Sequence, residues 1–386
     1  MKKILIIGAG FLQDFIITKA RELGYYTIAI DGNPYAVGLG HADESAVIDI
    51  IDQKACYGFA KDKDIQGVLT AATDFGVLSA SYVAEKLHLP GLNYIVAKRI
   101  KNKYEVRKKL IEACADDMQE VFEVDVNTDL EALDLHYPVM VKPCDGSGSR
   151  AAKRVDCAED LANACRAAMN ASLERKALIE TFVSGNEYGA ESLVVDGEIH
   201  VLAIMKKWMT RPPYYAELGH QIPSELPAEL ENKAIECVRN TIKALEINHG
   251  AVNMDLIINE KGEVHIVDVG ARMGGNMIGP CIIPSGTGIN YMENLIKTAV
   301  DDEPDWSRKQ AEDVATRLLA FKGGTIKRLP DFGTLSRQYG VSIYHHMNVG
   351  DVVNEYHSNL DGCGYIVAKD SETAERVLAI ISDYIF

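Results

Sequence analysis

The sequence predicts an α/β protein that begins with a doubly wound parallel sheet and continues into strand-rich units. Two observations lead to this fold class. The first hundred residues alternate short apolar runs with segments of helical spacing, as at 4–7 and 15–23. From about residue 118, strand pairs joined by short turns become frequent, as at 188–204 and 252–269.

The first strand and helix are predicted from an apolar run and the glycines after it. Residues 4–7 are all apolar, which is typical of a strand buried on both faces of a parallel sheet. Gly8-Ala9-Gly10 marks a turn, and apolar residues at helical spacing then continue to a stop at Gly24. A second strand at 27–30 ends at Asp31. This pattern predicts a Rossmann-like unit.

A further strand, a helix and a basic segment complete the N-terminal third. We expect the strand at 68–71 and the helix at 77–87, closed by Leu89-Pro90-Gly91. The segment 97–109 is strongly basic and predicts the start of one helix that reaches about Ala113. Most of these charges are expected to face solvent, with at least one directed at an anion.

The remaining elements are read from apolar runs and turn residues. We expect strands at 139–141, 177–180, 188–195, 199–204, 252–258 and 264–269, helices at 157–171, 230–245, 290–300 and 372–384, and a polar boundary at 301–310.

Composition excludes several classes of protein. The 386 residues allow two or three domains, and 40 basic against 56 acidic residues give a net charge of −16. This charge disfavours non-specific binding to nucleic acid or an anionic membrane. No apolar run reaches the roughly 18 residues of a transmembrane helix, and the eight cysteines are scattered without a CxxC pair. We therefore expect a cytoplasmic enzyme with reduced thiols.

The turn Gly8-Ala9-Gly10, together with Asp31, resembles a dinucleotide-binding fingerprint. The third glycine position of that fingerprint is Gln13. The alternatives are a structural turn or a turn that holds a substrate carboxylate at a helix N-terminus. Dinucleotide binding is the least favoured of the three readings.

Two later features carry more chemistry. Lys142 ends a predicted strand and precedes the glycine- and serine-rich segment 145–150, a combination that suits phosphate oxygens. Asp255 and Asp268 lie on two strands joined by the short turn 259–262, which predicts that their carboxylates are close together. Two adjacent carboxylates repel each other, and Mg²⁺ would relieve that repulsion. The alternative is two solvated acids.

The order of these features resembles the ATP-grasp superfamily along nearly the whole chain. The residues that carry the resemblance are Lys103, Lys142 with its loop, Glu180-Thr181-Phe182-Val183, Glu187, Asp255, Asp268, Arg272 and the terminal run Gly362–Ala368. The resemblance implies a Rossmann-like domain at 1–98, an ATP-grasp domain at 99–300 with a mobile glycine-rich lid at about 116–178, and a small strand-rich C-terminal segment at 301–386.

The family pattern implies roles for these residues. Lys103 and Lys142 would contact phosphates, and Glu180 would accept a hydrogen bond from the adenine amine. The ATP contacts implied in full are Lys103, Lys142, Ser147, Gly148, Ser149, Glu180, Phe182, Val183 and Glu187. Asp255 and Asp268 would bind Mg²⁺, or Mn²⁺ in its place. The family more often has Glu at both metal positions and Asn where this chain has Gly270.

Within the superfamily, the chain is most similar to L-amino-acid ligases of the bacilysin-synthetase kind. The segments 217–220 and 271–276 carry this similarity. Glu217 would bind a substrate ammonium and His220 the acyl-phosphate or carboxylate oxygens. The substrate contacts implied are Asp74, Glu217, His220, Arg272 and Gly275, of which His220 and Arg272 are catalytic together with Lys142.

These roles predict an ATP- and Mg²⁺-dependent ligase that activates a carboxylate as an acyl phosphate and joins it to an amine. The alternatives are an ATP-dependent carboxylase or formate-using ligase of the purine type, and an ATP-binding regulatory protein without turnover. We expect small-molecule substrates, no nucleic acid or membrane partner, and a homodimer, because dimers are common among relatives.

Overall fold

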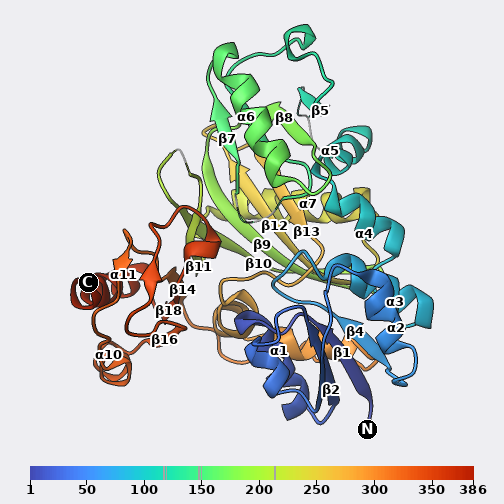
Figure 1. The fold of residues 1–386 in the computed structure, drawn as a ribbon, viewed down its shortest axis with the longest axis vertical. Helices are drawn as coiled ribbons and strands as arrows, with labels where there is room; N and C mark the ends of the chain where they lie inside the picture. The colour runs from blue at the N-terminus through green and yellow to red at the C-terminus, as the bar shows by residue number, and fades with distance from the viewer. Residues whose placement is uncertain (116–117, 119, 147, 149, 213) are drawn as a thin grey trace.

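The N-terminal unit is a four-stranded parallel sheet in the order β3-β2-β1-β4 (Figure 1). The computed structural model describes residues 1–115, 118, 120–146, 148, 150–212 and 214–386. The elements of this unit are β1 (Lys3–Ile7), α1 (Phe11–Glu22), β2 (Tyr26–Asp31), β3 (Glu44–Val47), α2 (Gln53–Ala60), β4 (Gly67–Leu69) and α3 (Val77–Leu87).

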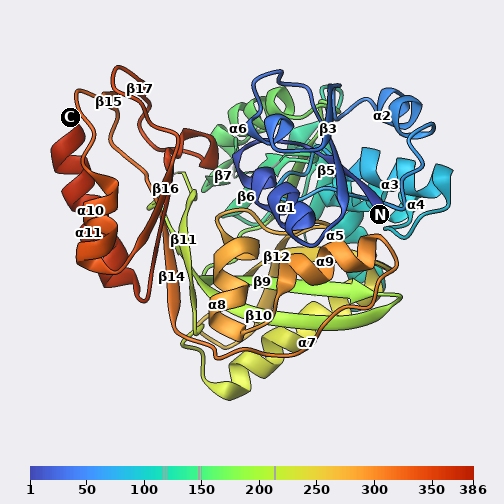
Figure 2. The same ribbon diagram turned by 90° about the horizontal axis from the view of Figure 1, so that it is seen from below.

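Both faces of this sheet are covered, as the apolar run in β1 predicts. Leu5 and Ile7 pack with residues of α2 and α3. Ile4 and Ile6 pack on the opposite face, with α1 and with α9 (Tyr291–Ala299), a helix from much later in the chain. Figure 2 shows α1 and α9 near each other. The predicted doubly wound α/β unit is therefore confirmed.

The basic segment forms two helices, so the predicted single helix is wrong. α4 (Tyr94–Lys101) ends at Asn102, and α5 (Lys103–Glu112) begins directly after it. The Asn102 side chain accepts hydrogen bonds from the backbone N–H groups of Tyr104 and Glu105, which caps α5. This break places Lys103 at the first position of α5. The domain boundary expected after residue 98 falls inside α4.

A small antiparallel sheet follows in the segment expected to form the lid. Its strand order is β5-β8-β6-β7, with α6 packed against it (Figure 1). The elements are β5 (Val121–Val124), β6 (Val139–Pro143), β7 (Lys153–Val155), α6 (Ala158–Ala171) and β8 (Ala177–Thr181).

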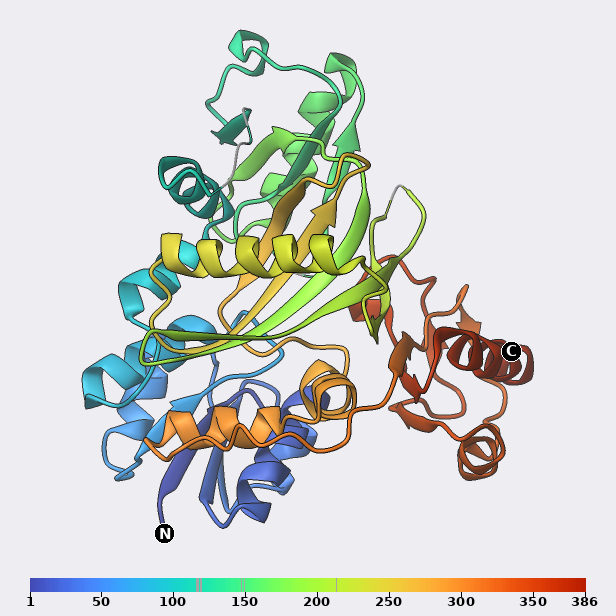
Figure 3. The same ribbon diagram turned by 180° about the vertical axis from the view of Figure 1, so that it is seen from behind.

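The largest sheet has eight strands in the order β13-β12-β9-β10-β11-β14-β18-β16. It contains β9 (Asn186–Val195), β10 (Glu198–Met209), β11 (Glu217–Ile222), β12 (Gly250–Ile258), β13 (Val264–Gly270), β14 (Val314–Leu318), β16 (Ser342–His345) and β18 (Gly364–Ala368). Helix α7 (Ala228–Ala244) lies across one face of it (Figure 3). The strands of the C-terminal segment thus extend the sheet of the central unit.

The remaining elements are distributed over the units described above. They are a π-helix (Ile278–Ile282), α8 (Ile283–Thr287), α10 (Phe332–Tyr339), α11 (Ser371–Ile385), the short strands β15 (Gly324–Thr325) and β17 (Val352–Val353), and the 3₁₀ turns Val37–Gly40, Leu130–Ala132 and Asn359–Asp361. In the described ranges, none of the helices combines the length and hydropathy that a membrane crossing needs.

Candidate active site

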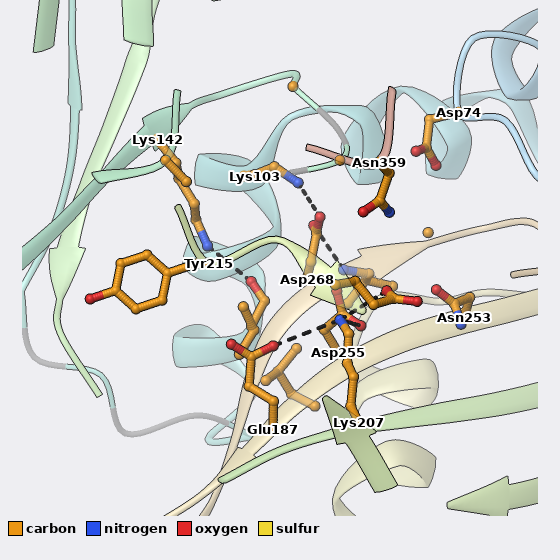
Figure 4. Close-up of a pocket in the computed structure, with 18 of the residues that line it drawn as sticks. Asp74, Lys103, Lys142, Glu187, Lys207, Tyr215, Asn253, Asp255, Asp268 and Asn359 are labelled. Atoms are coloured by element: carbon orange, nitrogen blue, oxygen red, sulfur yellow. Dashed lines mark hydrogen bonds and ion pairs between the residues drawn. The ribbon is translucent and has the colours of Figure 1, made fainter. Parts of the chain in front are cut away.

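A cavity of about 860 Å³ lies where the N-terminal unit, the small sheet, the central sheet and the C-terminal segment meet. β12 and β13 form one wall, and β6 and β8 of the small sheet contribute another. The loop that contains Asp74 reaches it from the N-terminal unit, and Asn359 and Tyr365 reach it from the C-terminal segment. The cavity therefore gathers residues that are far apart in the sequence (Figure 4).

The two acids predicted to lie together are direct cross-strand partners. Asp255 on β12 is paired with Asp268 on β13, and both point into the cavity (Figure 4). Asp268 forms an ion pair with Lys103, and the Asp255 Oδ1 atom lies 2.7 Å from Lys207 Nζ. Burial opposes ionisation of Asp268, but Lys103 and Lys142 outweigh it and lower its pKa.

These two carboxylates fit the chemistry of a magnesium site. They supply hard oxygen ligands at one place, and Mg²⁺ commonly takes one or two carboxylates together with water and substrate phosphates. No group of three or more His, Cys, Asp or Glu side chains suited to a metal occurs in the part of the chain that the structure describes. At Gly270, an added Cβ would lie 3.1 Å from Arg272 Cζ, so the missing side chain leaves room for that guanidinium.

Lys142 reaches the cavity from the end of β6. Its Nζ lies 2.6 Å from Glu180 Oε1 and donates to the Val267 carbonyl at 2.9 Å. Burial lowers the pKa of Lys142, and Glu180 opposes that shift. The second oxygen of Glu180 accepts from Arg107 Nε at 2.7 Å. Both Glu180 oxygens are therefore engaged, and a contact with an adenine amine would add to or replace these bonds.

The segment after β8 connects the small sheet to β9 and lines the cavity from 181 to 187. The Arg154 guanidinium lies 4.6 Å from the centre of the Phe182 ring. Glu187 Oε2 is 3.7 Å from Lys207 Nζ, and burial raises the pKa of Glu187 although Lys207 opposes this. Phe182, Val183 and Glu187 thus face one cavity, as an adenosine site would require.

Arg272 is held by the N-terminal unit. Its Nε and Nη2 donate to the two oxygens of Asp74 at 3.0 and 3.1 Å, a bidentate pair. Its Nη1 donates to Asn253 Oδ1 at 3.2 Å, and Asn253 lies opposite Gly270 on the paired strand. Burial opposes the charge of Arg272, but Asp74 outweighs it and raises the pKa. Gly275 also lines the cavity.

A second buried cluster surrounds Glu217. Its carboxylate lies 3.0 Å from His220 Nδ1 and 3.3 Å from Lys207 Nζ, and it accepts from the Asn276 amide. Burial would raise the pKa of Glu217, but His220 and Lys207 together lower it to about 2. Glu217 and His220, each predicted to contact the substrate, are thus adjacent, and both line the cavity.

Lys207 joins the two clusters and was missed in the sequence. It is buried between Asp255, Glu217 and Glu187. The strand that carries it was expected to end at residue 204, whereas β10 runs to Met209. Met205, which is buried, lies two residues before Lys207. Because side chains alternate along a strand, this apolar residue was the available signal that the strand continues and that Lys207 lies on its buried face.

Other missed residues form a network behind Arg272. Buried Glu191 accepts from the Tyr291 hydroxyl at 2.5 Å, from Gly274 N at 3.0 Å and from Asn253 Nδ2 at 2.9 Å. Burial raises the pKa of Glu191 to about 7. The predicted contacts Ser147 and Ser149 lie outside the described residues, and Gly148 is exposed at the cavity edge with φ +68°.

The turn Gly8-Ala9-Gly10 is closed by its own side chains. Asp31 Oδ2 accepts from Ala9 N at 2.7 Å. Gln13 donates to the Ala71 carbonyl at 2.7 Å, and its Oε1 would lie 2.9 Å from a Cβ on Gly10. These contacts support the structural reading of the turn.

Residues 135–280 match the family model described as the ATP-grasp domain. The chain therefore contains an ATP-grasp domain, as the sequence predicted. The enzyme class is that of the ATP-grasp ligases, as the sequence predicted.

Three similar proteins extend this result. An L-amino acid ligase from Bacillus licheniformis has the same fold over 100% of this chain and 98% of its own, with a TM-score of 0.86 and 22% identity. An uncharacterized protein, y4rH, from Sinorhizobium fredii is 23% identical over 91% of this chain and 75% of its own length. D-alanine–D-alanine ligase B from Clostridium perfringens is 26% identical over 44% of this chain, which spans 57% of that ligase.

Proposed function

We propose that this protein is an ATP- and Mg²⁺-dependent carboxylate–amine ligase whose carboxylate substrate is an amino acid. The observation that carries the proposal is the convergence of Lys103, Lys142, Asp255, Asp268 and Arg272 on one cavity. The similarity to an L-amino acid ligase and to D-alanine–D-alanine ligase B supports an amino-acid substrate.

A carboxylate reacts poorly with amines, so activation must come first. In the proposed reaction, a carboxylate oxygen attacks the γ-phosphorus of ATP, the bond to the β-phosphate oxygen breaks, and an acyl phosphate and ADP form. Lys103, Lys142 and Lys207 would bind phosphate oxygens, and Arg272 would stabilise charge on the transferred group. An uncharged amine then attacks the acyl carbon, phosphate leaves, and the amine loses a proton.

Asp255 and Asp268 would hold magnesium, which when bound supplies charge neutralisation to the phosphates. In the structure their negative charges are matched by Lys207 and Lys103. The same lysines would turn toward phosphate oxygens as the acids take the metal. The acids and lysines of the cavity thus suit the joint uptake of a cation and a polyphosphate.

The substrate end of the cavity is assigned to Glu217, His220 and Arg272. Glu217 is charged, because its pKa is about 2, and it would attract a substrate ammonium. His220 and Arg272 would face the carboxylate and later the acyl phosphate. Asp74 holds the guanidinium of Arg272 in place through two hydrogen bonds.

Acyl-phosphate trapping tests the proposal. The protein is incubated with ATP, Mg²⁺, hydroxylamine and each amino acid in turn, and hydroxamate and phosphate are measured. A hydroxamate that depends on one or a few amino acids is expected. Phosphate release that responds to bicarbonate or formate and not to amino acids would instead indicate the purine-type alternative, and ATP binding without turnover would indicate a regulatory protein.

A further inference from the structure

One lysine that lines the cavity is left unused by the proposed reaction. Lys101 is the last residue of α4 and lines the cavity. Its Nζ lies 5.2 Å from the centre of the Phe75 ring, within the range of a cation–π contact. Phe75 follows Asp74 in the chain, so Lys101 faces the loop of the N-terminal unit that holds Arg272.

Lys101 differs from the other lysines of the cavity in its lack of a counter-ion. Lys103, Lys142 and Lys207 each have a carboxylate oxygen within ion-pair distance. Among the described residues, no carboxylate lies within 4.0 Å of the Lys101 ammonium. Three lysines are therefore neutralised inside the protein, and the fourth is not.

The two acids that act most strongly on the charge of Lys101 already have other hydrogen-bond partners. Burial lowers the pKa of Lys101, and Asp74 and Asp145 oppose that shift most strongly. Asp74 uses both oxygens for Arg272. Asp145 accepts from the backbone N–H groups of Leu173 and Glu174 at 3.0–3.3 Å.

A partly buried charge without a partner is unfavourable, and an anion from outside would remove that penalty. The position of Lys101 suggests which anion. Its neighbour Asp74 holds Arg272, which is assigned to the acyl phosphate, so a small molecule that attacks the acyl carbon could reach Lys101 with a second group.

We infer that Lys101 and the Phe75 ring form an oxyanion subsite for an acidic group, carboxylate or phosphate, carried by the amine substrate. This inference rests on the proposed ligase function. It adds that the second substrate is an anionic amine and that the neutral amine hydroxylamine bypasses the subsite. ATP phosphates are the competing source of the anion.

Kinetics of Lys101→Gln test the subsite. With the amino acid that gives the largest hydroxamate signal, turnover is measured with hydroxylamine, glycine, glycinamide and aminomethylphosphonate as amines. We expect kcat/KM for glycine or aminomethylphosphonate to fall about 10- to 100-fold, because a charge-assisted bond is lost. The values for hydroxylamine and glycinamide, and the KM for ATP, should stay unchanged. A larger loss of kcat/KM for glycine would identify the ligand of the subsite as a carboxylate, and a larger loss for aminomethylphosphonate would identify it as a phosphate-type group.

Two further variants serve as controls. Lys98→Gln changes an exposed lysine of the same helix and should leave all four amines unaffected. Lys101→Arg should restore the preference for an acidic amine. An equal loss with all four amines, a loss confined to ATP, or no loss at all would overturn the subsite.

Chemical protection tests the subsite without turnover and so separates it from the ligase proposal. Acetylation of Lys101 by a lysine-reactive ester is followed by mass spectrometry, with Lys98 as the internal reference. Glycine or aminomethylphosphonate should slow the reaction of Lys101, and glycinamide should not. Equal rates with all three compounds would contradict the subsite, whereas absent hydroxamate in the earlier assay would contradict only the ligase.

Discussion

The N-terminal turn and the cavity use polar residues in opposite ways. At Gly8-Ala9-Gly10, the acid Asp31 accepts from Ala9 N and Asn33 N, and Gln13 fills the neighbouring space. In the cavity, Asp255, Asp268 and Glu217 are matched mainly by ammonium and imidazole groups that line the same space, although Asp268 also accepts from Val269 N and Glu217 from the Asn276 amide. Polar groups bound to backbone fix a fold, whereas charges paired across a cavity can exchange their partners for a ligand.

The largest effect is expected when charged side chains of the cavity are removed. Lys142→Ala and Asp268→Ala should each abolish ADP formation, a loss beyond about 1,000-fold, because transition-state charge loses its stabilisation. Rates are measured with a coupled ADP assay, and circular dichroism checks the fold. Lys153→Ala, at an exposed position paired with Val141 in the same small sheet, is the matched control. Normal turnover in either cavity variant would remove its assignment.

Glu217→Ala should act on the substrate more than on the nucleotide. Loss of the carboxylate that faces a substrate ammonium should lower kcat/KM for the amino acid about 30- to 1,000-fold, equivalent to roughly 2–4 kcal/mol. The KM for ATP should change little, although Lys207 loses one of its acidic neighbours. Steady-state kinetics for both substrates decide the matter. An equal loss toward ATP would show that Glu217 serves the nucleotide site through Lys207.

Glu191 should make stability depend on pH. Its pKa is about 7 in the folded protein, whereas the ordinary value of a glutamate is 4.5, so the folded state binds an extra proton between these two pH values. The unfolding free energy should therefore fall by about 3 kcal/mol as pH rises from 4.5 to 7, at 1.36 kcal/mol per pKa unit. Urea unfolding of the protein and of Glu191→Gln across this range measures it. A constant difference between the two proteins would refute the assignment.

The smallest effect is expected at the N-terminal turn. Asp31→Ala removes the acceptor of two backbone N–H groups, which should lower the unfolding free energy by about 1–3 kcal/mol. The kcat of the folded protein should not change. Chemical denaturation and ADP formation at saturating substrate measure the two quantities, and a lost kcat with normal stability would give this turn a role in binding.

The pairing of the two strands that carry Asp255 and Asp268 could be predicted from the sequence, but the ion pairs between distant parts of the chain could not. The short turn after Ile258 brings the two strands together, but its register alone would place Asp255 opposite Val267. A β-bulge between Asp255 and Leu256 moves the partner of Asp255 to Asp268. The pairing of Arg272 with Asp74 joins residues from two units of the chain, and no local pattern signals it. Lys207 was missed for another reason. The two consecutive lysines Lys206 and Lys207 interrupt an apolar run, and such an interruption usually marks the end of a strand.

The helices show the same limit. The amphipathic helix at 230–245 was recognised from its spacing and is present as α7. The basic segment was read as one helix because its composition is uniform, whereas the Asn102 side chain divides it. A single capping residue therefore decides where Lys103 stands, and composition does not reveal it.

The position of α9 has a consequence for synthesis and for truncation. The N-terminal sheet is complete in the chain at β4, yet Ile4 and Ile6 share their core with Leu295 and Ile296. Gly67 lies so close to α9 that an added Cβ would be 2.3 Å from the Ala299 carbonyl oxygen. During translation, this face stays without its full cover until residue 299 has emerged. A fragment that ends near residue 98 would expose apolar surface and should aggregate unless the later helix is supplied.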